Sequence, residues 1–373
     1  MRSLVLVGAG HVHLGVLARF ARRPLAGVTV TVVDPADEGA YSGALPPALA
    51  GVRPLDTARI PAPAIVHAAG GRWRSGRVVA VDEGARAVTL ADGTRLPADV
   101  VSLDTGARAA IDDVEGAHRL SAVRPFGAAR ALDARLATLA PTADVVVVGA
   151  GAAGVELAIA IAVRRRRAGA RGRVHLVDAA TAVVPGWSPG ARRHVHDALA
   201  ALDITVTLGA GVRRVTDDGV ALDDGTSIGA RLVVWAAGTA PHPLALPPEA
   251  ARSARGFPLV DATLRVIGTR ALFGGGDGVD HAAHPALEKS GVHAVRQGAV
   301  LARNLRVACA GRAALAPWTP RTRTLALLDA GDGTAIARWG AASHRGRLAL
   351  LLKRRLDDGY VARLRALAAS VGR

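Results

Sequence analysis

The sequence predicts an α/β fold in which one nucleotide-binding plan occurs twice and a C-terminal α/β cap follows. An apolar run enters a glycine-rich turn at 8–10 and again at 149–154, and a helical stretch follows each turn. Each copy then has a strand-like run that ends on an acid, Asp34 in the first copy and Asp178 in the second. Each copy continues into a hairpin with an Asp-Gly turn and a further strand that ends at a glycine.

The expected elements follow this plan along the chain. In order, they are strands at 3–7, 28–34 and 100–106 with a hairpin at Asp92-Gly93, a helix at 128–140, strands at 144–148, 173–178 and 232–238 with a hairpin at Asp224-Gly225, a strand at 272–273, a helix at 291–307, a hairpin at 325–328 and 335–337, and one or two basic amphipathic helices at 345–367. We expect the first nucleotide-binding domain to come in two parts, 1–120 and 244–310. The second domain occupies 121–243 and the cap 311–373.

Composition sets limits on function. Half of the 373 residues are hydrophobic and 21% are charged, which is typical of a chain that forms a core. A single cysteine, Cys309, excludes a disulfide framework and a redox dithiol on this chain. The net charge of +16 is carried almost entirely by arginine, and the few aromatic residues argue against a nucleic-acid partner. No apolar run reaches the roughly 18 residues of a membrane span, so we expect a cytoplasmic protein, either soluble or peripheral on the inner face of the plasma membrane. The sequence specifies no oligomeric state.

The second glycine motif, Gly149-x-Gly151-x-x-Gly154, is complete. Its first glycine makes the tight turn, the second lets the backbone approach a pyrophosphate, and the third lets helix and strand pack closely. Asp178 follows Gly154 by 24 residues, where a carboxylate accepts hydrogen bonds from a ribose diol. A carboxylate there repels a 2′-phosphate, so the motif predicts NADH and disfavours NADPH.

The first motif, Gly8-Ala9-Gly10-His11-Val12-His13, has His13 in place of the third glycine. Asp34 follows Gly10, the last glycine of this motif, by 24 residues, as Asp178 follows Gly154, the last glycine of the other. Two dinucleotide sites on one chain suggest two different dinucleotides. We assign FAD to the first copy and a nicotinamide nucleotide to the second, with hydride transfer between them.

These features resemble the pyridine nucleotide-disulfide oxidoreductase superfamily, with its two Rossmann-like (glutathione-reductase-like) domains, over nearly the whole chain. The resemblance rests on the paired motifs, the Thr105-Gly106 and Ala237-Gly238 turns, Gly276-Asp277, and the stretch 293–298. Within it, the chain is most similar to the type II NADH dehydrogenase-like branch. It is also similar to a group found fused to selenophosphate synthetase, at 41–46, 290–298 and 331–333.

The resemblance implies two sets of cofactor-binding residues and two catalytic ones. For FAD they are Gly8, Gly10, His11, Asp34, Val78, Thr105, Gly106, Gly276, Asp277 and Val292, and for NAD they are Gly149, Gly151, Gly154, Asp178 and Gly238. Glu156 is the candidate for orienting the nicotinamide or assisting reduction of the acceptor, the alternative being a solvated helix residue. Gln297 would face the acceptor, the alternative being a capping or packing role. No metal is expected, because Asp280, His281 and His284 have no fourth partner.

The chain departs from the disulfide reductases, which carry a cysteine pair where this chain has 41–46. We therefore expect an FAD-dependent NADH oxidoreductase that passes electrons directly to a small quinone-like acceptor. An acidic electron-transfer protein or oxygen is an alternative acceptor. A flavin-binding redox partner in selenium metabolism is an alternative function.

Two basic segments complete the sequence-based expectations. The run Arg164–Arg167 ends a helix and is expected to stay solvated. Leucines recur at three- and four-residue spacing in 345–367, which predicts a basic amphipathic helix that lies on an anionic membrane, covers the flavin domain or forms a dimer interface. The apolar positions are Leu348, Leu351, Leu352, Leu356, Tyr360, Leu364 and Leu367.

Overall fold

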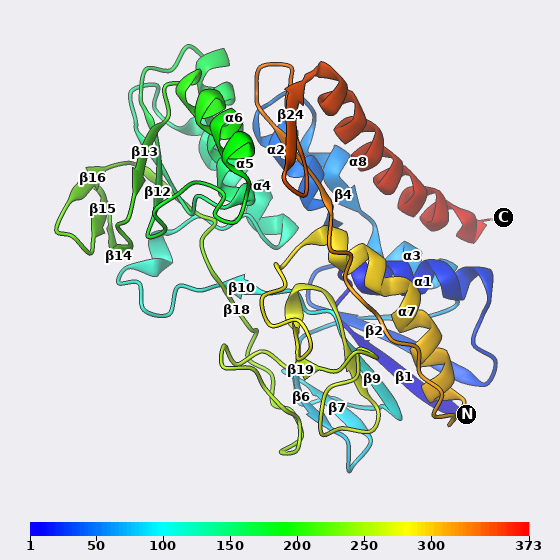
Figure 1. Ribbon diagram of the computed structural model, residues 1–373. Coiled ribbons are helices and arrows are strands. Elements are labelled where there is room, and N and C mark those ends of the chain that lie inside the picture. Colours follow the sequence, from blue (N-terminus) through cyan, green and yellow to red (C-terminus); the bar gives the residue numbers. More distant parts are fainter. Residues whose placement is uncertain (373) are drawn as a thin grey trace.

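The computed structural model describes the backbone of residues 1–372 and the side chains of residues 1–370. It contains two parallel sheets, one in each nucleotide-binding unit (Figure 1). The first has the order β20-β9-β1-β2-β5, formed by β1 (Arg2–Val7), β2 (Val28–Asp34), β5 (Arg72–Ser75), β9 (Val100–Leu103) and β20 (Leu272–Gly274). The second has the order β13-β12-β11-β17, formed by β11 (Val145–Val148), β12 (Val174–Asp178), β13 (Thr205–Leu208) and β17 (Leu232–Trp235). The predicted α/β class with parallel sheets is confirmed.

Burial on both faces explains why these strands read as continuous apolar runs. In β11 all four valines are buried, and Leu4–Val7 of β1 are equally enclosed. The first sheet is completed by β20, so the chain returns to the first unit after leaving the second. The division into residue ranges given above remains a prediction.

Each central strand leads through its glycine turn into a helix. β1 leads into α1 (His11–Arg22), and β11 leads into α5 (Ala152–Arg167). Beside α1 runs α7 (Gly291–Cys309), and the two helices approach closely at Gly15 and Gly298. A Cβ on Gly298 would lie 2.9 Å from the Val12 carbonyl oxygen and 3.1 Å from the Gly15 Cα. Glycine at both positions therefore lets α7 cover the first sheet beside α1.

The two Asp-Gly hairpins form as predicted. Gly93 and Gly225 adopt φ values of 83° and 88°, the left-handed conformation such turns require. The corresponding three-stranded sheets are β6 (Val78–Asp82), β7 (Ala87–Leu90) and β8 (Arg95–Pro97), and β14 (Val212–Thr216), β15 (Gly219–Leu222) and β16 (Ser227–Gly229).

The remaining elements lie within and between these units, and four of them are α-helices. They are β3 (Gly39–Ala40), η1 (Ser42–Ala44), α2 (Leu45–Leu49), η2 (Leu55–Ala58), β4 (Arg59–Ile60), α3 (Ala62–Ala68), β10 (Arg108–Ala109), η3 (Ala117–Arg119), α4 (Phe126–Thr138), α6 (Pro189–Ala200), β18 (Thr239–Ala240), β19 (Leu259–Val260), η4 (Gly276–Gly278) and β21 (Asp280–His281). The β10 and β18 strands pair antiparallel, so the two chain crossings between the units run side by side.

The cap consists of β22 (Leu325–Asp329), β23 (Ala335–Trp339), β24 (Ala342–Gly346), α8 (Arg347–Ala368) and η5 (Ala369–Gly372). Its strands contact α6 of the second unit, while α8 packs on β23 and on α3 of the first unit (Figure 1). The cap therefore bridges the two units. Among the helices of the described residues, none combines the length and the apolar character needed to cross a membrane.

The predicted apolar stripe of α8 packs against the protein only in the second half of the helix, through Tyr360, Leu364 and Leu367. The buried residues of the whole helix are Ala349, Leu350, Lys353, Val361 and Leu364. Four predicted stripe residues point to solvent, with exposed fractions of 77% for Leu348, 59% for Leu351, 41% for Leu352 and 49% for Leu356. The first half of the helix thus presents an unpacked apolar face.

The expectation of a fully solvated arginine run at the end of α5 is wrong for Arg165, which is only 6% exposed. Its Nη2 donates hydrogen bonds to the carbonyl oxygens of Pro141 and Ala143 at 3.1 and 2.5 Å. The guanidinium instead ties α5 to the chain that enters β11.

Candidate functional site

The two glycine turns are held by the same pair of contacts. In the first copy the Ala9 N–H donates to Asp34 Oδ2 at 2.8 Å, and in the second the Ala150 N–H donates to Asp178 Oδ2 at 2.5 Å. The other oxygen of each carboxylate accepts an N–H two residues further along the chain, at 2.8 Å in both copies. Each oxygen still has a free lone pair, so the predicted contact with a ribose hydroxyl remains open.

The second turn is open towards solvent at its middle glycine. Gly149 has φ +112°, and a Cβ on Gly154 would lie 1.7 Å from the Gly149 carbonyl oxygen, so both positions require glycine. At Gly151, by contrast, a Cβ would meet nothing within 4 Å. Gly151 is also the N-cap residue of α5 and has no side chain to accept a hydrogen bond from the first turn of that helix. Free N–H groups at a helix N-terminus beside open space fit a pyrophosphate.

The first turn is built differently, because His13 stands where the second copy has Gly154. Its Nδ1 lies 2.6 Å from the Gly8 carbonyl oxygen and its Nε2 lies 2.9 Å from Ser102 Oγ. Burial lowers the pKa of His13 to about 4, so the imidazole is neutral. The ring therefore bridges the turn and β9, with one hydrogen bond to each, where the second copy has close backbone packing.

A carboxyl group fills the mouth of this first turn. The Asp104 Oδ2 accepts the His13 N–H at 2.8 Å, and a Cβ on Gly10 would lie 2.5 Å from the carboxyl atoms. Burial raises the pKa of Asp104 to about 8, against the hydrogen bond from His13. Sequence reasoning missed this residue, although aligning the two copies at Gly106 and Gly238 sets Asp104 opposite the apolar Ala236.

The late Gly276-Asp277 turn lies against this mouth. A Cβ on Gly276 would lie 2.7 Å from Asp104 Oδ1. The Asp277 carboxylate pairs with Arg124, with 3.2 Å between Oδ2 and Nη1. The residues proposed to bind the flavin portion therefore converge on one place, with Thr105 Oγ1 2.9 Å from where a Cβ on Gly278 would lie.

Gln297 has both ends of its amide engaged inside the protein. Its Oε1 accepts the Gly276 N–H at 2.7 Å, and its Nε2 lies 3.0 Å from His281 Nε2. The side chain is 1% exposed. These contacts favour the packing alternative, in which Gln297 positions the Gly276 turn.

The remaining predicted residues are spread around the two turns. Gly106 and Gly238 adopt φ values of 65° and 59° after β9 and β17. Val292 lies in the first turn of α7, with its N–H 3.3 Å from Ser290 Oγ, while Val78 is buried in β6.

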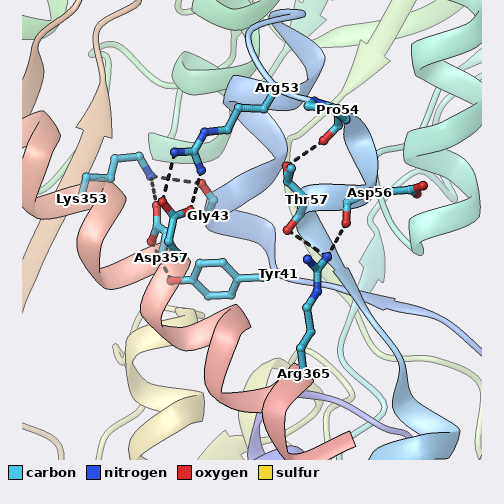
Figure 2. A network of polar contacts seen from close by, with 10 residues as sticks. Tyr41, Gly43, Arg53, Pro54, Asp56, Thr57, Lys353, Asp357 and Arg365 are labelled. Atoms are coloured by element: carbon cyan, nitrogen blue, oxygen red, sulfur yellow. Dashed lines mark hydrogen bonds and ion pairs between the residues drawn. The ribbon is translucent and has the colours of Figure 1, made fainter. Parts of the chain in front are cut away.

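Glu156 is enclosed by the cap instead of being solvated. Its Oε1 accepts the Asp329 N–H at 2.9 Å and lies 3.4 Å from Lys353 Nζ. Burial raises the pKa of Glu156, and the opposing effect of Lys353 is smaller. Lys353 continues the network, with Nζ 3.1 Å from Asp357 Oδ2 and 3.2 Å from the Gly43 carbonyl oxygen (Figure 2).

An aromatic cluster links this network to the first glycine turn. The Tyr41 hydroxyl donates to Asp357 Oδ1 at 3.0 Å, and the Tyr360 hydroxyl lies 3.1 Å from His11 Nδ1. The rings of Tyr41 and Tyr360 are 4.8 Å apart. Burial lowers the pKa of His11 to about 4 and raises the pKa of both tyrosines, so all three side chains are neutral. Through these contacts α8 reaches the two helices that follow the glycine turns, α1 at His11 and α5 at Glu156.

Further along, Arg365 fixes α8 to the first unit through the carbonyl oxygens of Asp56 and Thr57 (Figure 2). Sequence reasoning missed the roles of Lys353 and Asp357. The available signal was that Lys353 is one of two lysines in an arginine-rich chain.

The histidines near β21 are not arranged around an ion. Asp280 is held by Lys289 Nζ at 2.8 Å and Arg255 Nη2 at 2.7 Å. Within residues 1–372 no group of three His, Cys, Asp or Glu side chains is placed to hold a metal.

Known proteins were compared with this chain by family, by sequence and by structure. Residues 2–298 match the family described as pyridine nucleotide-disulphide oxidoreductase. The NADH dehydrogenase-like protein MT1860 of Mycobacterium tuberculosis (strain CDC 1551) is 32% identical over 241 residues, covering 60% of this chain and 59% of that protein. The chain thus matches less than two thirds of its relative.

Two solved structures share the fold at low identity. A sulfide:quinone oxidoreductase from Aquifex aeolicus gives a TM-score of 0.83 at 15% identity and covers 98% of this chain and 92% of that one. An NDH2 from Plasmodium falciparum in complex with NADH gives a TM-score of 0.81 at 13% identity, with coverages of 96% and 97%. These two structures agree with the predicted fold, while the family model and the NADH dehydrogenase-like relative agree with the predicted family and branch.

Proposed function

Because the chain belongs to the pyridine nucleotide-disulphide oxidoreductase family, whose cofactors are FAD and NAD(H), we propose that it oxidises NADH and reduces a quinone-like acceptor directly. The observation that carries this proposal is the combination of two dinucleotide turns with one inert thiol. Cys309 is 6% exposed, and burial raises its pKa to about 11. Electrons therefore have no dithiol to pass through on this chain.

Bound FAD would supply the chemistry that this reaction needs, namely acceptance of a hydride from NADH and transfer of two electrons to the acceptor. The second turn would hold NADH by its phosphates at Gly151 and its ribose at Asp178. The first turn, with Gly276-Asp277 and the first turn of α7, would hold FAD.

Reducing a quinone to a hydroquinone takes two electrons and two protons, while NADH supplies two electrons and one proton. One further proton must come from solvent through the protein. We assign the storage of this proton to Glu156, which forms a buried ion pair with Lys353 two residues after the second glycine turn. Glu156 thus assists acceptor reduction, and Lys353 and Asp357 position it.

A spectroscopic titration tests this function. The purified protein should show a flavin spectrum that bleaches with NADH under anaerobic conditions and returns on addition of a short-chain quinone. Gly151→Asp is the matched control, because the new carboxylate enters open space where the NADH phosphates dock. It should keep the flavin spectrum but need much more NADH for bleaching. Bleaching without recovery by quinone would overturn the quinone assignment.

A second acceptor class is favoured by the net charge of +16. A basic surface steers an acidic electron-transfer protein, and salt screens that attraction. If such a protein is the acceptor, quinone reduction will be slow, and turnover with an acidic ferredoxin will fall steeply with ionic strength.

We also propose that the protein binds peripherally to an anionic membrane through α8, on the cytoplasmic face. The exposed leucines of its first half lie among the exposed Arg347, Arg354 and Arg355. Apolar side chains flanked by arginines suit an interface of acyl chains and acidic headgroups. A membrane-bound protein would meet a lipid-soluble acceptor at its own surface.

A further inference from the structure

The two glycine turns have the same arrangement of strand, turn and helix. They differ in what faces the second glycine of each, Gly10 and Gly151. At Gly151 a Cβ would find open space, whereas at Gly10 it would lie 2.5 Å from the Asp104 carboxyl group. The residue that follows the strand neighbouring each turn makes the difference, since the second copy has Ala236 at this place. The first copy therefore places a carboxyl group where the second leaves room for phosphates.

This carboxyl group already occupies the helix end. Its Oδ2 accepts the His13 N–H at 2.8 Å, and Asp104 is 4% exposed. Its other oxygen faces Gly276, where a Cβ would lie 2.7 Å away. It is thus enclosed between the two backbone segments that the family uses to hold FAD.

The surrounding charges are unfavourable to a second anion. The carboxylates of Asp34 from β2 and Asp277 from η4 both act on Asp104, and Arg124 is already paired with Asp277. The groups that face it from α1 and α8 are neutral, namely His11, His13 and Tyr360. An ionised Asp104 would add a further negative charge beside the pyrophosphate of FAD, whereas a neutral carboxylic acid can donate a hydrogen bond to it.

We propose that Asp104 is a cofactor-binding residue that acts in its neutral form, as a hydrogen-bond donor to the pyrophosphate of FAD. FAD affinity is then coupled to the protonation of Asp104, and the first turn releases its cofactor as the solution becomes alkaline. This inference rests on the proposed function, because it requires FAD in the first turn.

The coupling has a defined sign and size. Burial raises the pKa of Asp104 to about 8 in the protein without cofactor, so the binding-competent acid form predominates at neutral pH. The dissociation constant of FAD should increase about 30-fold between roughly pH 7 and pH 9.5, and little below pH 7.

The test measures the dissociation constant of FAD from the apoprotein between roughly pH 6 and pH 9.5. Binding is monitored by the change in flavin fluorescence. Asp104→Asn keeps a donor that cannot ionise, so its affinity should vary less than about threefold over this range. Asp92→Asn is the matched control, because it makes the same chemical change at an exposed carboxylate in a hairpin turn. It should reproduce the wild-type profile.

Each outcome decides something. A wild-type dissociation constant that stays flat across the range overturns the inference and leaves the proposed function intact. An Asp104→Asn profile as steep as that of wild type also overturns it, because another group then titrates. If wild type binds no FAD at any pH, both fail. Should Asp104→Asn not fold by circular dichroism, the wild-type profile still decides.

Discussion

The Nζ atom of Lys353 in α8 lies 3.4 Å from Oε1 of Glu156 in α5, so the last helix of the chain is joined to the helix of the second glycine turn. Only 6% of the Lys353 side chain and 14% of the Glu156 side chain are exposed. A buried ion pair adds little net stability, but removing one partner leaves an unpaired charge. This contact therefore makes the cap and the second unit depend on each other.

Lys353→Met should destabilise the protein strongly, because Glu156 and Asp357 would lose their shared cation. We expect a loss of about 3 kcal/mol in the free energy of unfolding, measured with urea. Adding Glu156→Gln should recover part of that loss, since the unpaired carboxylate is removed. Arg166→Ala is the control for an exposed pair, with 59% of Arg166 and 87% of Asp203 exposed, and should cost less than about 1 kcal/mol. A loss as small for Lys353→Met would show that the pair is not coupled.

The three most strongly perturbed histidines should make the protein less stable as the solution becomes acidic below about pH 6.5. Asp104 acts in the opposite direction, because its raised pKa lets the folded chain hold a proton that the unfolded chain lacks in this range, but it is one group against three. Burial lowers the pKa of His11, His13 and His281 to about 4 from a model-peptide value of 6.5. Between these values the unfolded chain binds protons that the folded chain does not, so the free energy of unfolding decreases with decreasing pH. Each histidine should contribute a slope of about 1.4 kcal/mol per pH unit in that window.

Denaturant titrations from roughly pH 7 to pH 4.5 would measure this slope. His13→Gln should make it shallower, because one of the three buried imidazoles is gone. His196→Gln, at an exposed position of α6, is the matched control for the substitution itself. An unchanged slope in His13→Gln would contradict the neutral, buried state of this ring.

Folding of the second turn requires glycine at Gly154, as it does at Gly149, but not at Gly151. Gly154→Ala should abolish folding of the second unit or lower the melting temperature by many degrees, because its Cβ would lie 1.7 Å from the Gly149 carbonyl oxygen. Gly151→Ala should fold normally, because a Cβ there meets nothing within 4 Å, yet bind NADH more weakly by obstructing the approach of the phosphates. Thermal melting and NADH titration separate the two effects. Equal melting temperatures for the two variants would refute this division of roles.

Much of the fold was predictable because buried parallel strands and glycine turns have recognisable patterns within short stretches of sequence. Four consecutive buried valines in β11 and the spacing of Gly149, Gly151 and Gly154 leave few alternatives. β24 was missed, since Ala342–Gly346 has no apolar alternation and is held by pairing with β23. Strand pairing with a neighbour is a tertiary property that a local pattern does not contain.

The site was less predictable for the same reason. Asp104 and Lys353 gain their roles from neighbours 91 and 310 residues away in the chain, His13 and Gly43. The buried Arg165 was misread because its carbonyl partners belong to the segment before β11. In α8 the periodicity correctly predicted an amphipathic helix but not which face packs in its first half, where Lys353 is buried and Leu351 and Leu352 are exposed.

That open face yields the last prediction, which concerns the membrane. The wild-type protein should sediment with vesicles that contain phosphatidylglycerol and remain in solution with pure phosphatidylcholine, because both the arginines and the leucines of α8 are needed. Changing Leu348, Leu351 and Leu352 together to serine should reduce vesicle binding at least tenfold without lowering the melting temperature, since all three side chains are already exposed. Val295→Ser, at an apolar position of α7 that is 36% exposed, is the matched control and should bind as wild type does.

Two results would contradict this assignment of α8. Equal binding of wild type and the triple variant to anionic vesicles would show that the leucines do not insert. Alternatively, the wild-type protein could fail to bind vesicles and form a dimer that dissociates in the triple variant. This face would then be an interface between two copies of the chain. Sedimentation equilibrium on both proteins distinguishes that case, because only a dimer interface changes the mass in the absence of lipid.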